Sequence, residues 1–311
     1  RKKAAACRQQ HPARTDTTGK KKCDMKTLYE VMDGSGEDEK RLRKAGEILK
    51  AGGLVAIPTE TVYGLGGDAL NPESSRRIYA AKGRPSDNPL IVHICRFSDL
   101  ERIAWDPDGR AALIARAFWP GPLTMILKKK DTVPMETTGG LSTVAVRFPS
   151  HPAAQGLIAA AGGFVAAPSA NTSGKPSPTS ARYVAEDMDG RIDMILDGGD
   201  VGIGLESTIL DLTEDEPMIL RPGYVTQEML EEVLGRVSVD RTILDAASDR
   251  RPKAPGMKYR HYAPKGELAV VEGEPGRVTL RINELCQKAA AEGKKTGVIA
   301  ADETAPLYLA D

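Results

Sequence analysis

The feature that most constrains the fold of this chain is a regular alternation of helix-like and strand-like segments between residues 38 and 237. Over residues 39–50 the apolar side chains recur at the spacing of one helix face. The next apolar run, residues 54–57, is short and continuous, which is typical of a buried strand. Such alternation over roughly 200 residues is typical of one α/β domain. Because several connections are short enough for hairpins, we expect a mixed sheet with flanking helices.

The same patterns place the elements of this domain along the chain. The predicted helices span residues 39–50, 73–81, 111–118, 153–161, 179–187 and 226–235. The predicted strands span residues 54–57, 90–94, 123–127, 143–148, 163–167, 194–196, 207–211 and 218–221.

The segment before this domain has a different composition. Residues 1–24 carry eight Lys or Arg residues and two Asp residues, without apolar periodicity. We expect this basic extension, with the lead-in up to residue 37, to be disordered. Its simplest interpretation is an extension upstream of Met25. The alternative is an organelle transit segment, which is Arg-rich and poor in acidic residues.

The segment after this domain divides into a linker and the beginning of another unit. Residues 238–264 are polar, contain several prolines and lack periodicity, so they are predicted to form a linker. Residues 265–311 then show the pattern of one βαβ unit, with strands at 267–271 and 296–300 around a helix at 278–291. Because one such unit cannot cover both faces of a sheet, we expect the chain to stop partway through a second domain.

Composition limits the classes of function. The 43 basic and 43 acidic residues give zero formal net charge, which argues against bulk nucleic-acid binding but leaves a local basic groove open. No apolar run approaches the roughly 18 residues that span a bilayer, so we expect no membrane association. The scattered cysteines Cys7, Cys23, Cys95 and Cys286 form no disulfide framework and fit a reducing cytoplasm. The four histidines have no metal-like spacing.

Two short polar clusters suggest a phosphate site. Lys82 and Arg84 are two cations one residue apart, with Asn88 close behind. Ser169 and Asn171 are a hydroxyl and an amide one residue apart. The cations would offset phosphate charge, and the hydroxyl and amide would donate directional hydrogen bonds. The glycine-rich P-loop pattern is absent, so the sequence predicts a nucleotide site of another design.

Other polar residues also fall where strands end, and ligands bind at strand ends in open α/β sheets. Thr59, Thr61, Arg147 and Arg221 are examples. Each taken alone could cap a turn or form an ordinary ion pair. His93 lies inside the apolar run 90–94. A histidine in such a run is usually a core residue whose ring nitrogens have hydrogen-bond partners within the protein. The combination favours a binding site over these separate explanations.

Four motifs carry a family resemblance, in residues 58–66, 82–85, 168–174 and 204–209. With them the sequence resembles the YrdC/TsaC family, the threonylcarbamoyl-AMP synthases, over about residues 38–237. That resemblance implies a YrdC-like twisted mixed sheet. Residues 255–264 are similar to the linker of the long, two-domain form. In that form a smaller Rossmann-like domain follows, which residues 265–311 would begin.

The resemblance also implies a reaction, carried out by a nucleotidyltransferase. L-Threonine, bicarbonate and ATP would give L-threonylcarbamoyladenylate and pyrophosphate, for N6-threonylcarbamoyladenosine (t6A) modification of tRNA. The threonine carbamate would attack the α-phosphate, and an anion attacking a polyanion needs charge neutralisation and alignment. Downstream tRNA threonylcarbamoyl-transfer proteins, a weak tRNA contact and a cytoplasmic location are implied as well. Mg²⁺ would accompany ATP, held mostly by phosphates and water.

Matching motifs assign residues to these roles. The L-threonine set would be Thr61, His93, Arg147, Ala167 and Ser207. The ATP set would be Lys82, Arg84, Asn88, Thr143, Ser169, Asn171, Ser177, Arg221 and Tyr262. Lys82, Arg84, Ser169 and Asn171 would carry catalysis. The linker 238–264 would lie over the active site.

Three other functions are compatible with part of this pattern. An RNA-binding module could use the same basic cleft, although an aromatic content of 5% leaves few residues for base stacking. Related carbamoyl-adenylate chemistry for metallocentre assembly would come with acylphosphatase and zinc-finger segments, and neither is visible. A regulatory relative that binds ATP without catalysis is the third alternative. The presence of both the Lys82/Arg84 and the Ser169/Asn171 pairs argues against it. Threonine-dependent turnover would separate the synthase from all three.

Overall fold

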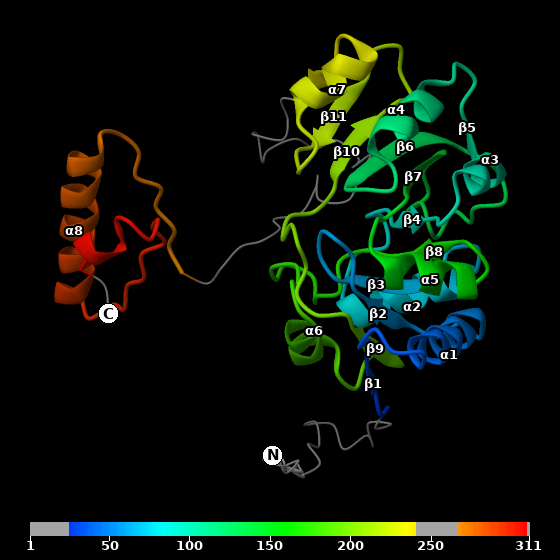
Figure 1. The fold of residues 1–311 in the computed structure, drawn as a ribbon, viewed down its shortest axis with the longest axis horizontal. Helices are drawn as coiled ribbons and strands as arrows, with labels where there is room; N and C mark the ends of the chain where they lie inside the picture. The colour runs from blue at the N-terminus through cyan, green and yellow to red at the C-terminus, as the bar shows by residue number, and fades with distance from the viewer. Residues whose placement is uncertain (1–24, 241–265, 310–311) are drawn as a thin grey trace. The chain divides into compact units, whose positions relative to one another are not determined.

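The computed structural model describes residues 25–240 and 266–309 of the chain (Figure 1). The chain divides into two compact units, residues 1–263 and residues 264–311. The basic residues 1–24 and residues 241–264 of the expected linker lie outside the described residues.

The described part of the first unit alternates helices and strands as the sequence predicts. Its helices are α1 (Asp38–Lys50), α2 (Pro72–Lys82), α3 (Leu100–Ile103), α4 (Arg110–Phe118), α5 (Pro152–Ala160), α6 (Ala181–Met188) and α7 (Gln227–Leu234), with a short 3-10 turn η1 (Phe97–Asp99). Its strands are β1 (Leu28–Val31), β2 (Val55–Ile57), β3 (Gly64–Asp68), β4 (Ile91–His93), β5 (Ala104–Trp105), β6 (Leu123–Lys129), β7 (Thr143–Arg147), β8 (Val165–Ala166), β9 (Met194–Asp197), β10 (Thr208–Asp211), β11 (Met218–Arg221) and β12 (Ser238–Val239).

These strands form one 12-stranded mixed sheet, which confirms the predicted fold class. The order is β1-β9-β2-β3-β8-β4-β7-β6-β10-β11-β12, and β5 pairs with β6 beside this path. The parallel pairs are β1/β9, β2/β9, β4/β7, β6/β10 and β11/β12. The remaining pairs are antiparallel.

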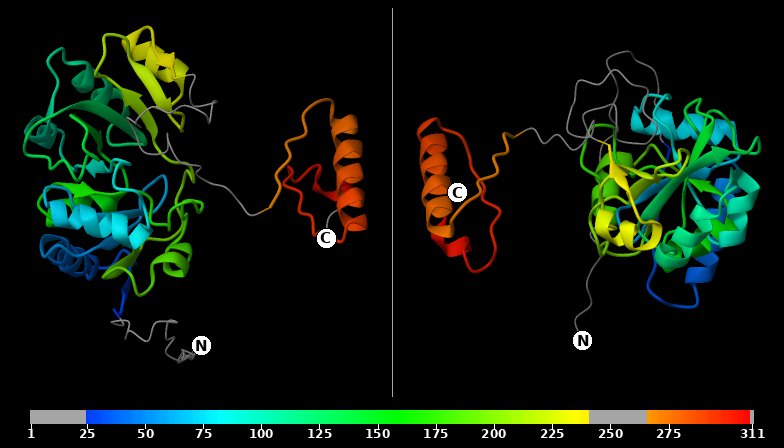
Figure 2. Two further views of the ribbon diagram at one scale, coloured as in Figure 1. Left: turned by 180° about the vertical axis from the view of Figure 1, so that it is seen from behind. Right: turned by 90° about the horizontal axis from the view of Figure 1, so that it is seen from above.

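Helices cover the sheet at several places. α1 and α5 lie side by side, so close that a Cβ on Gly46 would stand 2.7 Å from Ala160 (Figure 1). Together they cover an apolar cluster that includes Leu49, Val55 and Leu157. α2, the cyan helix in the view from behind, packs on β3 (Figure 2). α4 and α7 pack against each other near the other end of the sheet.

Register places the polar ends of the central strands on one face. In the parallel pair β4/β7, His93 is the partner of Arg147, and Ile91 is the partner of Ala145. In the antiparallel pair β6/β7, Thr124 is opposite Arg147. Because side chains alternate between faces, Ala145 and Arg147 share a face with their partners. A small apolar cluster of Ile91, Ile126, Ala145, Ile209 and Leu220 therefore adjoins the polar strand ends.

Four strands of the first unit were not predicted, β1, β3, β5 and β12. The lead-in expected to be disordered contributes β1, a four-residue edge strand that pairs in parallel with β9, so that expectation is wrong for residues 28–31. β3 has the sequence Gly-Leu-Gly-Gly-Asp, which has low strand propensity. Its glycines are required by close packing, because a Cβ on Gly67 would stand 3.0 Å from Ile78. The expected linker also begins late, since residues 238–239 form β12.

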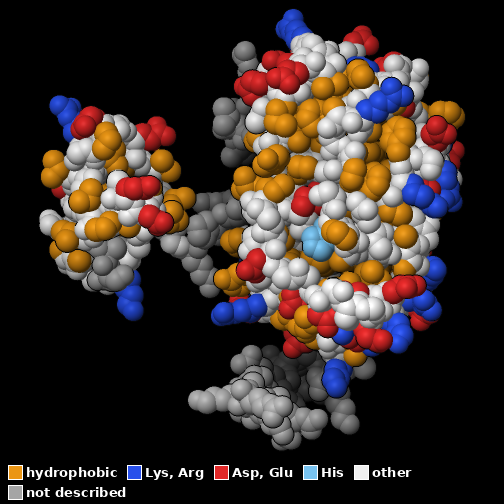
Figure 3. Space-filling view, in the orientation of Figure 1, with side chains coloured by type: hydrophobic (Ala, Val, Ile, Leu, Met, Phe, Trp, Pro, Cys, Tyr) orange, Lys and Arg blue, Asp and Glu red, His pale blue; other side chains and the backbone are white. Residues whose placement is uncertain are grey.

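The second unit is described over residues 266–309. The predicted helix is confirmed as α8 (Pro275–Ala291), followed by a 3-10 turn η3 (Ala305–Leu307). The strands expected at 267–271 and 296–300 do not form within residues 266–309. A strand requires a hydrogen-bonded partner, and here Leu268 and Ile299 are 77% and 98% exposed. Apolar side chains accordingly appear over the surface of this unit (Figure 3).

No helix within residues 25–240 and 266–309 is both long enough and apolar enough to cross a membrane.

Candidate active site

A cleft that opens to solvent lies at the ends of the central strands, where the empty space, open solvent included, is about 540 Å³. Its walls come from the segment between β2 and β3, the ends of β4, β7 and β11, and the segments after β8 and before β10. The lining residues are Thr59, Thr61, Val62, Gly64, Arg84, Ile91, His93, Arg147, Ala167, Pro168, Ser169, Glu206, Ser207 and Arg221. The motif residues 58–66, 168–174 and 204–209 therefore meet in one place.

All five residues expected to bind L-threonine line this cleft. They are Thr61, His93, Arg147, Ala167 and Ser207. They come from different elements, and the sheet register described above is what places His93 beside Arg147. We call this part of the cleft the Arg147 end.

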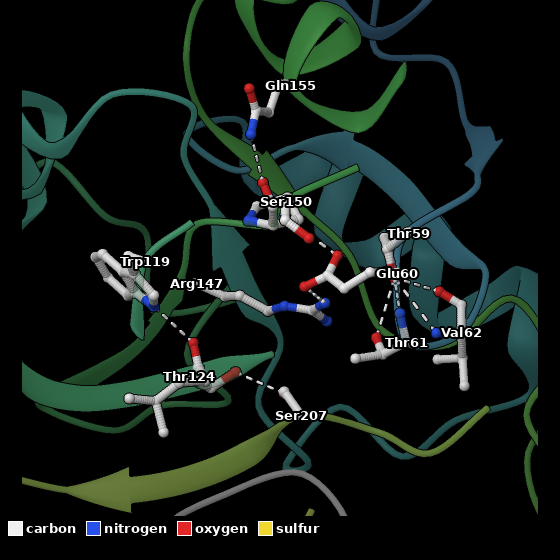
Figure 4. Close-up of polar contacts among 12 residues, drawn as sticks. Thr59, Glu60, Thr61, Val62, Trp119, Thr124, Arg147, Ser150, Gln155 and Ser207 are labelled. Atoms are coloured by element: carbon white, nitrogen blue, oxygen red, sulfur yellow. Dashed lines mark hydrogen bonds and ion pairs between the residues drawn. The ribbon is translucent and has the colours of Figure 1, made fainter. Parts of the chain in front are cut away.

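Arg147 is held by a carboxylate and keeps one donor without a partner in the described part of the chain. Its side chain is buried, and Nη2 donates to Oε1 of Glu60 over 2.7 Å (Figure 4). The other oxygen of Glu60 accepts from the backbone N–H of Ser150 at 3.2 Å. The Nε atom of Arg147 is buried and has no hydrogen-bond partner among the described residues. Because a buried donor without a partner is costly, Arg147 is suited to an anionic ligand.

His93 is neutral at the floor of the Arg147 end. Burial and the neighbouring Arg147 lower its pKa from 6.5 to about 3. Nδ1 lies 3.1 Å from the carbonyl oxygen of Ile91, and a neutral ring that donates there leaves Nε2 as an acceptor. The ring of His93 is buried, as expected of a core histidine, and it also lines the cleft, so its role toward a ligand stays a prediction.

Two pairs of hydroxyls complete the Arg147 end. Oγ1 of Thr59 lies 3.0 Å from Oγ1 of Thr61 and donates to the carbonyl oxygen of Val62 over 2.7 Å (Figure 4). Oγ of Ser207 lies 2.8 Å from Oγ1 of Thr124. These hydroxyls are fixed by neighbours, so the polar groups facing a ligand are oriented before it binds.

Three residues of the expected ATP set also line the cleft, Arg84, Ser169 and Arg221. We call their part of it the Arg84 end. Arg84 is held by Asn88, with Nη2 donating to Oδ1 of Asn88 over 2.6 Å and Nε to its carbonyl oxygen over 3.2 Å. Arg221 donates from Nε and Nη2 to the carbonyl oxygen of Ser207, at 3.1 and 3.0 Å. Ser207 therefore belongs to the Arg147 end and at the same time anchors a cation of the Arg84 end.

Lys82 and Asn171 lie behind the wall of the cleft and do not line it. Nζ of Lys82 donates to the carbonyl oxygens of Ser169 and Asn171, the second over 2.6 Å. The pKa of Lys82 is lowered well below 10.5, because burial disfavours its charge and Arg84 is close. Asn171 uses its own amide to close the turn that follows.

The remaining members of the ATP set have varied positions. Asn88 is buried and reaches the cleft through Arg84. Thr143 begins β7 on the same face as Arg147, about 13 Å from it at the usual strand rise. Ser177 donates to the carboxylate of Glu206, which lines the cleft. Tyr262 lies outside the described residues.

Sequence reasoning missed two carboxylates of the site. Glu60 holds Arg147, and Glu206 faces the cleft. Both lie inside the motifs that carried the resemblance, so an acidic residue within a motif that otherwise supplies neutral polar groups was the available signal. Over residues 25–240 and 266–309 no group of three or more His, Cys, Asp or Glu side chains could hold a metal ion.

Comparisons with known proteins agree with these motifs. The family model described as "Telomere recombination" matches residues 47–223, and the model described as "Threonylcarbamoyl-AMP synthase, C-terminal domain" matches residues 225–310. The threonylcarbamoyl-AMP synthase of Pyrococcus abyssi is 50% identical over 277 residues, 88% of this chain and 81% of the relative. That of Bacillus subtilis is 47% identical over 285 residues, 91% of this chain and 81% of the relative.

Solved structures agree as well. The crystal structure of P. abyssi Sua5 complexed with L-threonine is similar with a TM-score of 0.82 and 48% identity, covering 89% of this chain and 82% of that one. E. coli YciO is similar with a TM-score of 0.57 and 25% identity, covering 64% and 96%. The matches extend beyond the catalytic motifs and favour the synthase over an RNA-binding module. The chain thus belongs to the threonylcarbamoyl-AMP synthases with a YrdC-type and a Sua5-type C-terminal domain, nucleotidyltransferases that use ATP in t6A modification of tRNA.

Proposed function

We propose that the cleft binds L-threonine at the Arg147 end and ATP at the Arg84 end, so that the threonine carbamate is adenylated where the two ends meet. The observation that carries this proposal is the buried Nε atom of Arg147, which has no partner among the described residues. A guanidinium grips a carboxylate with two hydrogen bonds, and the threonine carboxylate would supply the missing acceptor. The relative solved with L-threonine supports this choice of ligand.

The other groups of the Arg147 end would orient the rest of threonine. Nε2 of His93 is an acceptor for an amine or hydroxyl hydrogen, because the ring stays neutral at ordinary pH. Ser207 and Thr61 offer hydroxyls that can donate or accept. Carbon dioxide from bicarbonate would then join the amine, and the carbamate oxygen would face the Arg84 end.

At the Arg84 end, the triphosphate would contact Arg84, Ser169 and Arg221. As the carbamate oxygen attacks the α-phosphate and pyrophosphate departs, negative charge spreads over the phosphate oxygens. Fixed cations stabilise that charge without having to reorient. A nucleotide extending along the face of β7 would reach Thr143. The contributions of Tyr262 and of the linker 238–264 stay predictions.

Mg²⁺ fits this site as a companion of ATP. The lining carboxylate of Glu206, beside the hydroxyl of Ser177, would supply one or two oxygen ligands, and phosphates and water would supply the others. Mg²⁺ would neutralise phosphate charge.

Residues 38–237 would form the catalytic domain and carry out the reaction. The product would pass to tRNA threonylcarbamoyl-transfer proteins in the cytoplasm. A reducing cytoplasm would keep the thiols of Cys95 and Cys286 free.

The proposal is tested by separating the two ends in solution. L-Threonine binding is measured by calorimetry without ATP, and pyrophosphate release is measured with threonine, bicarbonate or ATP omitted in turn. We expect threonine to bind alone, because the Arg147 end is formed without ATP, and release to require all three substrates. Release that is indifferent to threonine would contradict the proposal.

A further inference from the structure

We propose that Lys82 and Asn171 form a buried clamp that positions Ser169 and Arg84, and that neither clamp residue contacts ATP. The inference rests on the proposed ATP site at the Arg84 end. It assigns different tasks to the two members of each polar cluster. One member faces the ligand, and the other holds the wall of the cleft in place.

The first support is the position of the four side chains. Arg84 and Ser169 line the cleft, whereas Lys82 is 3% exposed and Asn171 is 6% exposed, behind the wall. Lys82 is the last residue of α2, and Gly83, with a left-handed φ of 60°, turns the chain so that Arg84 leaves in another direction. The one-residue spacing therefore separates the two cations.

The second support is that the polar atoms of the Lys82 and Asn171 side chains all have hydrogen-bond partners inside the protein. The ammonium of Lys82 has three N–H donors. They have three acceptors nearby, the carbonyl oxygens of Ser169 and Asn171 and, at 3.4 Å, Oδ1 of Asn171. The amide nitrogen of Asn171 donates to the carbonyl oxygens of Thr172 and Lys175, at 2.9 and 2.7 Å. No donor of Lys82 is left over for a phosphate oxygen.

The third support is that backbone contacts hold only part of the same segment. On one side, the N–H of Ala170 donates to the carbonyl oxygen of Tyr63 over 2.8 Å, which ties the segment to the beginning of β3. On the other side, the N–H of Ser173 donates to the carbonyl oxygen of Lys82 over 2.8 Å. Lys82 binds the carbonyl oxygen of Ser169, just before Ala170, and the carbonyl oxygen of Asn171, between Ala170 and Ser173. Removing the ammonium would leave Ser169, which lines the cleft, held through its backbone bridge to Gly64 alone.

The buried charge of Lys82 makes the clamp sensitive to substitution of this residue. Burial and the nearby Arg84 lower the pKa of Lys82, whereas its oxygen acceptors favour the charged form. Replacing Lys82 by an apolar side chain would leave the carbonyl oxygens of Ser169 and Asn171 buried without this donor. Such a change loosens the segment whether or not ATP is present.

The test measures hydrogen exchange in the protein without substrates, where no direct contact with ATP can contribute. In Lys82→Met and in Asn171→Ala, we expect amide exchange in residues 169–173 to accelerate about tenfold or more. We expect kcat/KM for ATP to fall about tenfold to a hundredfold and the Kd of L-threonine to change by less than about twofold. The double variant should lose little more than Lys82→Met alone, because the two residues act as one unit.

Lys175→Met is the matched control, because Lys175 lies on the same segment with its side chain 61% exposed and paired with Asp187. It should change neither the exchange nor the kinetics by more than about twofold. If Lys82→Met does not fold, Asn171→Ala decides, since it keeps the ammonium and its bonds to backbone. Unchanged exchange with a loss of ATP affinity would overturn the clamp in favour of direct phosphate contact. If the unaltered protein failed to bind ATP, the proposed function would fall, while the exchange result would still decide the clamp.

Discussion

The two ends of the cleft hold their cations in different ways. At the Arg147 end, the guanidinium has one carboxylate partner, Glu60, and a buried Nε atom without a partner among the described residues. At the Arg84 end, Arg84 already donates to Asn88 and to the carbonyl oxygen of Pro89. The Arg147 end thus gains a missing contact when a carboxylate binds, whereas phosphates at the Arg84 end must add to contacts that the protein makes for itself. This difference predicts that threonine recognition depends steeply on one residue and ATP recognition on several.

The largest effect should come from Arg147→Ala. Truncating one partner of a buried ion pair also leaves Glu60 without its cation, so kcat/KM for threonine should fall about a hundredfold or more. The affinity for ATP should change far less. Steady-state kinetics with each substrate varied would check both values, with Arg76→Ala at an exposed ion pair as the control. Equal losses for the two substrates would break the comparison.

Arg84→Ala should have the next largest effect, on ATP alone. We expect kcat/KM for ATP to fall about tenfold to a hundredfold, because Ser169 and Arg221 remain in place. Oδ1 of the buried Asn88 would lose its donor, so the free energy of unfolding should fall by about 1–3 kcal/mol. Calorimetry with L-threonine is the decisive control. A threonine Kd that rises as much as the KM for ATP would show that Arg84 serves both ends.

A smaller effect is expected from Glu60→Gln, which keeps the size of the side chain and removes its charge. Arg147 would then be less firmly positioned, and the Kd of L-threonine should rise about threefold to tenfold. Because the threonine carboxylate is the group affected, the analogue threoninol, which lacks the carboxylate, should bind the variant and the unaltered protein equally. Glu73→Gln, at an exposed ion pair, is the matched control. An equal loss for threoninol would indicate a general loosening of the cleft.

The smallest effect concerns pH and His93. Because its pKa is about 3 in the folded protein and 6.5 in the unfolded chain, the unfolded state binds more protons between these values. Stability contributed by His93 is therefore complete above pH 6.5 and declines as the pH falls, by at most about 1.4 kcal/mol per pH unit. Urea unfolding at pH 7 and pH 5 would measure this slope. His93→Gln should flatten it, and an unchanged slope would show that His93 is not neutral.

The fold was predictable where the pattern of the sequence is strong. Helices with an apolar face, such as α1, and apolar strands such as β6 were found from spacing alone. β1 and β3 were missed because their stability comes from pairing with β9 and β2 and from close packing at glycines. In residues 266–309 the opposite error occurred. The apolar runs were strand-like, but no neighbouring strand pairs with them.

The site was predictable to the level of motifs and less so to the level of side chains. Polar residues after strands were expected to converge, and Thr61, Arg147 and Ser207 do line one cleft. The sequence could not tell that Lys82 turns behind the wall while Arg84 lines the cleft, because that depends on the left-handed turn at Gly83 and on the path of residues 169–173. Glu60 was missed because its partner Arg147 is 87 residues away.

A crystal structure of this protein with L-threonine and a non-hydrolysable ATP analogue would test the central claim most directly. The account predicts the threonine carboxylate within hydrogen-bond distance of Nε of Arg147, and the triphosphate against Arg84, Ser169 and Arg221 in the same cleft. A threonine carboxylate bound elsewhere, with Nε of Arg147 still lacking a partner, would contradict it.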